Sequence, residues 1–72
     1  MAIIKEVKIE SDFITLGQFL KVADIISSGG EAKIFLSENK VFINDELDQR
    51  RGRKLYKDDV IRIDSKYYRV CI

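Results

Sequence analysis

The chain has 72 residues, of which 46% are hydrophobic and 35% charged, and its 13 Lys and Arg against 12 Asp and Glu give a formal net charge of +1. A chain of this length can hide only ~60% of the surface that its unfolded form exposes. That excludes the multilayer enzyme folds that enclose a deep cleft, and the hydrophobic content excludes a disordered segment. We therefore expect a single domain over residues 1–72.

The residue types that carry most enzyme chemistry are scarce. The chain has no histidine, the commonest general base and metal ligand, and a single cysteine, Cys71, which we expect to be a small buried hydrophobe in a last strand. No apolar run approaches the ~20 residues of a membrane span, and the charged start does not fit a signal peptide. We expect a cytoplasmic protein with no enzymatic activity, metal, cofactor or small-molecule substrate.

The first half of the chain predicts one strand and two short helices. Residues 3–9 alternate as a half-buried strand does, with Ile3, Val7 and Ile9 on one parity. Thr15 and Gln18 have the spacing of a capping box that opens a helix. The apolar stripe of that helix comprises Leu16, Phe19, Leu20, Ala23 and Ile26.

The second helix is predicted directly after the Ser27–Gly30 break. Ser28 and Glu31 repeat the capping-box spacing, and Asn39 stands where a left-handed residue would end the helix. Its apolar edge comprises Ala32, Phe35 and Leu36. After Lys40 the period changes to two, which predicts strands separated by turns at 44–45, 57–59 and 64–66. The expected fold class is α+β, with two short helices packed on a small, mostly antiparallel sheet.

The segment over residues 49–57 carries most of the charge asymmetry. It contains Arg50, Arg51, Arg53, Lys54 and Lys57. With no acid among them these make +5, so the other 63 residues sum to −4. Arginine suits phosphate because its planar group donates two parallel hydrogen bonds. The alternative is a solvated connection whose charges pair with the acids on either side.

Three smaller features add to this candidate site. Gly29 and Gly30 stand at a helix start, where free amides favour an anion, although a helix–helix turn that needs glycine torsions is the alternative. Lys33 lies in the first turn of the same helix. Gly52 allows a close backbone approach, and Tyr56 offers a ring to an unstacked base. Spacing alone does not show whether these groups converge.

Five strings of the sequence together resemble a known family. They are residues 16–20 (LGQFL), 28–33 (SGGEAK), 41–44 (VFIN), 50–55 (RRGRKL) and 59–61 (DVI). This order is similar to the RNA-binding domain of ribosomal protein S-four, also called the alpha-L RNA-binding motif, and especially to the small stand-alone bacterial YaaA-like proteins. The resemblance covers about residues 15–63.

The resemblance implies that the two helices and the following loop form one RNA-facing surface. Lys33 and the 50–54 group would then contact phosphates. The chain departs from the family at Thr15-Leu16-Gly17, where Arg-Leu-Asp is usual, and at Ser28-Gly29, where Ser-Arg is usual. Two basic phosphate contacts are therefore missing or relocated, which implies weaker or more selective binding.

We expect a monomeric, non-enzymatic module that binds structured RNA, with ribosomal RNA during ribosome assembly or maturation as the target. The alternative is a protein-interaction adaptor that presents its basic loop or a sheet edge to an acidic partner.

Overall fold

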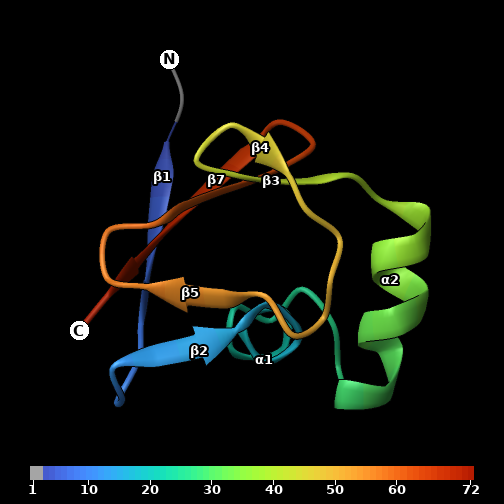
Figure 1. The fold of residues 1–72 in the computed structure, drawn as a ribbon, viewed down its shortest axis with the longest axis horizontal. Helices are drawn as coiled ribbons and strands as arrows, with labels where there is room; N and C mark the ends of the chain where they lie inside the picture. The colour runs from blue at the N-terminus through green and yellow to red at the C-terminus, as the bar shows by residue number, and fades with distance from the viewer. Residues whose placement is uncertain (1–2) are drawn as a thin grey trace.

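The computed structural model describes residues 3–72, which form two small sheets and two helices (Figure 1). The elements in chain order are β1 (Ile4–Lys8), β2 (Phe13–Thr15), α1 (Leu16–Val22), the 3₁₀ turn η1 (Gly29–Glu31), α2 (Ala32–Glu38), β3 (Val41–Ile43), β4 (Glu46–Leu47), β5 (Lys54–Tyr56), β6 (Val60–Ile63) and β7 (Lys66–Cys71). The predicted α+β class is confirmed. None of the helices within residues 3–72 has the length and apolarity that crossing a bilayer requires.

The larger sheet has five strands in the order β1-β7-β6-β3-β4. Its pairs are antiparallel except for β1 and β7, which run parallel with Val7 opposite Val70. The hairpin between β3 and β4 turns through Asn44 and Asp45, whose φ angles are 51° and 71°. Positive φ at both central residues is the pattern of a type I′ turn, which matches the twist of the flanking strands.

A second sheet, which the sequence did not reveal, pairs β2 with β5 in antiparallel register. Ile14 lies opposite Leu55, and both are buried. Residues 13–15 gave no strand signal because three residues are too few for a period-two pattern. The 49–57 segment, expected to be a loop, therefore ends in a strand that contributes Leu55 to the core.

The core lies between the larger sheet and the helices. Val41, Ile61 and Val70 come from the sheet and are almost wholly buried against Phe19 and Leu20 of α1. The Phe19 and Tyr68 rings meet edge to face at 86°, with centroids 5.7 Å apart. Burial of this apolar stripe holds a helix as short as α1 in place, because seven residues are too few to be stable alone.

Helix α1 begins as predicted and ends earlier than predicted. The capping box is confirmed, since the Gln18 amide donates to Thr15 Oγ1 and the Thr15 amide to Gln18 Oε1. The predicted continuation to Ile26 is wrong. Asp24 adopts φ 63°, its amide donates to Lys21 O, and the Ile25 amide donates to Leu20 O, which together form a Schellman motif. Ala23 and Ile26 are nevertheless buried.

Three predictions about the second helix are wrong. Ser28 makes no side-chain cap, and the chain enters α2 through η1 instead. Gly29 and Gly30 do not have the positive φ that the turn alternative required. Asn39 is extended, with φ −130°, and stops the helix through its own side chain, whose Nδ2 donates to Phe35 O at 2.9 Å.

The two ends of the chain depart from prediction in smaller ways. Ile3 is 87% exposed although its parity placed it with Val7 and Ile9, which are buried. It lies outside β1, so no sheet partner covers it. Cys71 lies in the last strand, as predicted, and is half-buried rather than buried.

Candidate nucleic-acid interface

The segment from Gln49 to Arg53 lies against the start of α1. The Leu16 amide donates to Arg53 O at 2.7 Å, and the Gly17 amide donates to Arg51 O at 3.0 Å. These donors belong to the first turn of α1 and have no acceptor inside the helix. These two hydrogen bonds therefore hold the basic segment against the start of α1. In Figure 1 the connection from β4 to β5, yellow to orange, passes this point.

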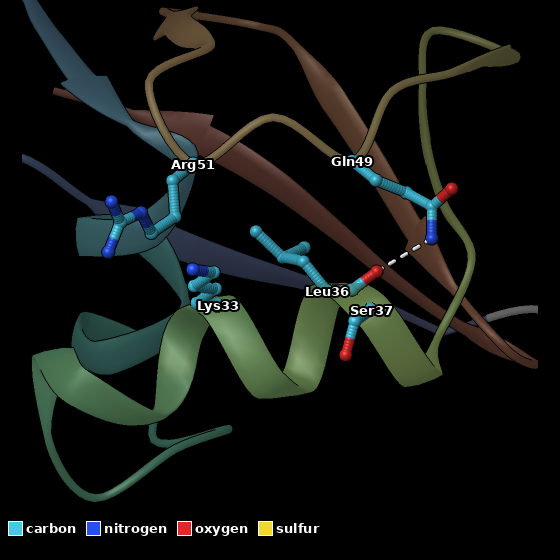
Figure 2. A pocket seen from close by; sticks show the side chains of 5 residues that line it. All are labelled: Lys33, Leu36, Ser37, Gln49 and Arg51. Carbon is cyan, nitrogen blue, oxygen red and sulfur yellow. Dashed lines mark hydrogen bonds between the residues drawn. The ribbon is translucent and has the colours of Figure 1, made fainter.

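A first hollow lies between this segment and α2. Lys33, Leu36, Ser37, Gln49 and Arg51 line it. Gln49 anchors its rim, because Nε2 donates to Leu36 O at 2.7 Å and to Asn39 O at 3.0 Å. Figure 2 shows Lys33 on α2 and Arg51 on the facing 49–53 segment, at the same end of this hollow. The tertiary structure thus brings two predicted site residues together.

A second hollow adjoins the first at Arg51. Its lining comprises Thr15, Gly17, Gln18, Lys21, Gly29, Ala32, Arg51 and Gly52. Lys21 lies outside the apolar stripe of α1, and nothing in the sequence singled it out for the site. Its proximity to Arg51 is visible only after folding.

Lys21, Lys33 and Arg51 define what we call the basic face. Neither hollow is lined by an aspartate or glutamate among the described residues. Within residues 3–72 none of the three cations forms an ion pair. All three are exposed. The basic face therefore presents uncompensated positive charge from three different elements around two adjoining concave surfaces.

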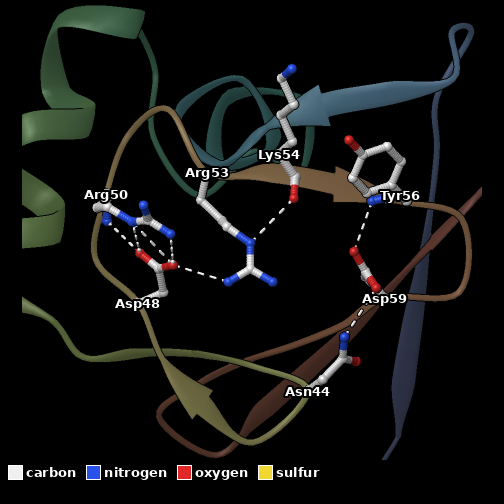
Figure 3. A network of polar contacts seen from close by, with 7 residues as sticks. All are labelled: Asn44, Asp48, Arg50, Arg53, Lys54, Tyr56 and Asp59. Atoms are coloured by element: carbon white, nitrogen blue, oxygen red, sulfur yellow. Dashed lines mark hydrogen bonds and ion pairs between the residues drawn. The ribbon is translucent and has the colours of Figure 1, made fainter.

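The neighbouring arginines differ, because Asp48 binds two of them (Figure 3). Arg50 donates to both Asp48 oxygens, with Nη2 to Oδ2 at 2.8 Å, and Arg53 Nη1 reaches the same oxygen at 3.0 Å. The Asp48 side chain is only 9% exposed. The hydrogen bonds from Arg50 hold the pKa of Asp48 well below its usual range, and Asp48 in turn raises the pKa of Arg50. The predicted pairing with neighbouring acids holds for these two arginines.

The remaining predicted residues lie apart from the two hollows. Lys54 and Tyr56 are on β5, where Lys54 Nζ lies 4.9 Å from the centroid of the Phe13 ring. Lys57 is exposed in the turn after β5, and Gly30 lines neither hollow. The predicted site thus divides into the basic face, the Asp48 cluster and the outer side of the β2–β5 sheet.

Two helices packed on a mixed sheet, with a basic segment fixed across the first helix, match the α+β fold expected of an S4 domain. The family model described as S4 domain matches residues 7–71. The chain belongs to this family.

A relative from Bacillus subtilis (strain 168) supports the assignment. It is described as probable ribosome maturation protein RlbA and is 62% identical over 59 residues, which cover 82% of this chain and 83% of the relative.

Proposed function

We propose that this protein is a monomeric, cytoplasmic, non-catalytic module that binds structured ribosomal RNA during ribosome maturation through its basic face. The observation that carries the proposal is the convergence of Lys33 and Arg51 on one hollow, with Lys21 beside them and no acid among the described residues of the lining. The name of the Bacillus relative supplies the ribosomal context.

The chemistry of the basic face suits a folded RNA backbone. Arg51 can donate two parallel hydrogen bonds to one phosphate, while Lys21 and Lys33 act as mobile point charges on either side. Because these groups surround concave surfaces, an RNA whose backbone protrudes there is favoured over a regular duplex, and selectivity comes from shape. Gly29 and Gly52 add no side chain to the second hollow, so a sugar–phosphate chain can approach the protein backbone.

The other predicted contacts have lesser roles in this proposal. Arg50 keeps its side chain 75% exposed while paired, so it retains donors for phosphate at reduced net charge. Arg53 is more deeply placed and mainly positions Asp48. Lys54, Lys57, Gly30 and Tyr56 lie outside the two hollows and would contact RNA only beyond the basic face.

The test is equilibrium binding of Bacillus subtilis 16S and 23S ribosomal RNA to the full chain, measured by filter retention. We expect Arg51→Ala and Lys33→Ala each to raise Kd about 5- to 30-fold, since a hydrogen bond to a charged group is worth roughly 1–2 kcal/mol. Lys66→Ala, which removes an exposed cation of β7 outside both hollows, is the matched control and should leave Kd unchanged. Equal effects of all three substitutions would reject the assigned surface.

The adaptor alternative makes a different prediction. The edge strand β1 exposes Lys5, Glu6 and Lys8, and charged edges discourage the addition of a foreign strand. We therefore expect an acidic protein to bind at the basic face rather than at the β1 edge. A complex recovered from cells that survives both nuclease and high salt would favour that alternative over RNA.

A further inference from the structure

The outer side of the β2–β5 sheet carries an exposed aromatic pair that neither the core nor the basic face explains. Phe13 and Tyr56 lie directly opposite one another in the register, with ring centroids 6.0 Å apart and planes inclined at 46°. Phe13 is 39% and Tyr56 49% exposed. Lys54, on the same side of the sheet, places Nζ 4.9 Å from the centroid of the Phe13 ring.

The core does not require aromatic residues at these positions. Ile14 and Leu55 alternate with them and point inward, where both are buried. Strand propensity and cross-strand pairing would be satisfied by threonine or valine at positions 13 and 56. The two rings are nevertheless held in fixed register and partly exposed to solvent, and the Lys54 ammonium lies over the Phe13 ring.

This surface is continuous with the basic face. A third hollow is lined by Phe13, Ile14 and Val22 together with Gln18 and Lys21. Gln18 and Lys21 also line the second hollow, which in turn shares Arg51 with the first. The three hollows therefore form one path from α2 across α1 to the edge of the β2–β5 sheet.

The net positive charge of the lining falls along the path. Among the described residues, the first two hollows are lined by cations without an acid, whereas Glu10 lines the third together with Lys8 and Lys21. The third hollow therefore attracts phosphate less than the basic face does, and a neutral base is not affected by this difference. Asp59 also lies near Tyr56. Each of its carboxylate oxygens already accepts a hydrogen bond, one from the Tyr56 amide at 2.8 Å and the other from Asn44 Nδ2 at 3.0 Å (Figure 3).

We propose that the Phe13–Tyr56 face is a stacking site for one unpaired base of the bound RNA, adjacent to the phosphates held by the basic face. The inference rests on the proposed function and adds to it that the RNA has an extruded or single-stranded nucleotide at this point. Aromatic rings accept any base because every base has a π face, so this site contributes affinity with little sequence preference. Lys54 and Lys57 flank the rings and suit the phosphate of the stacked nucleotide.

The first test uses fluorescence, because the chain contains no tryptophan. Tyr56→Trp places a single indole on the stacking face, and Leu47→Trp places one on β4, where the side chain is 53% exposed and far along the larger sheet. On titration with 16S and 23S ribosomal RNA we expect quenching of the indole at position 56 and little change at position 47. Binding that leaves both indoles equally affected would overturn the stacking site while leaving the proposed function intact.

The second test measures affinity with variants that keep the strands. Phe13→Val and Tyr56→Thr retain strand propensity, and circular dichroism checks that each variant is folded. We expect each to raise Kd for the RNA about 5- to 30-fold without changing the slope of log Kd against log salt, because stacking releases no counterions. Leu47→Thr is the matched control. Unchanged Kd in both folded variants rejects the stacking site, and absence of binding by the unaltered chain rejects this inference together with the proposed function.

Discussion

Asp48 determines which arginines of the basic segment are available. It lies between β4 and β5, where its nearly buried carboxylate accepts hydrogen bonds from Arg50 and Arg53 and also from the Arg50 amide at 3.0 Å. Arg51, between these two arginines in sequence, is not an ion-pair partner of Asp48 and lines both hollows. One carboxylate thus binds two of the three arginines of this segment and leaves Arg51 without an ion pair within residues 3–72.

Acid should weaken the fold through this residue. Because the folded-state pKa of Asp48 lies below its unfolded value of about 3.9, the pair contributes its full stability above that pH and loses it as pH falls. Asp48→Asn should cost about 1–2 kcal/mol at pH 7, as expected for hydrogen bonds to a charged group. Thermal unfolding between pH 2 and 7 measures this difference, which should shrink toward the acid end. A difference that is constant over that range would contradict the assigned ion pair.

Several short elements are held by residues that adopt left-handed backbone without being glycine. Asp24 ends α1, Asn44 and Asp45 form the β3–β4 turn, and Asp64 begins the β6–β7 turn at φ 56°. Aspartate and asparagine tolerate this region better than other side chains, but at some conformational cost. Five of the described residues have this conformation, and all five are aspartate or asparagine, so the residue type itself favours the change of chain direction.

The β3–β4 turn offers a direct test of that cost. Asp45→Gly should stabilise the protein by about 0.5–1 kcal/mol, because glycine adopts φ near 71° freely and Asn-Gly is the preferred type I′ pair. Glu46→Gly removes the same charge one residue later, within β4, and should destabilise by a similar amount because glycine weakens a strand. Denaturant midpoints of the two variants compare them. Shifts in the same direction would mean that charge, rather than backbone conformation, controls stability here.

The formal net charge of +1 conceals an uneven distribution of charged side chains over the protein. The basic face gathers three cations from α1, α2 and the segment between β4 and β5 that form no ion pair within residues 3–72, while Asp48 reduces the effective charge of its two arginines. RNA affinity should therefore depend on these three groups and not on the average charge. Such an arrangement favours binding that is sensitive to salt.

The salt dependence of RNA binding measures how many cations take part. Three phosphate contacts predict that log K falls against log salt with a slope of roughly −2 to −3, and Arg51→Ala should reduce its magnitude by about 1. Filter retention at salt concentrations from about 50 to about 300 mM, a range that includes physiological ionic strength, gives both values. A slope near zero would show that the basic face does not contact phosphate.

The local features of this protein follow from its sequence. Periodicity predicts the α+β class, Thr15 and Gln18 fix the start of α1, and the Asn44-Asp45 turn follows from residue types alone. These features depend on residues within a few positions of one another, where backbone geometry leaves few alternatives. The family resemblance likewise follows from the order of short strings.

The tertiary structure decides the pairing of distant groups. The β2–β5 sheet, the parallel β1–β7 pair and the meeting of Lys21, Lys33 and Arg51 all join segments that are remote in sequence. No local pattern distinguishes Arg51 from Arg50 or Arg53, because that choice depends on which side chains reach Asp48. Composition therefore predicts a basic segment, whereas packing determines which of its charges remain free to bind.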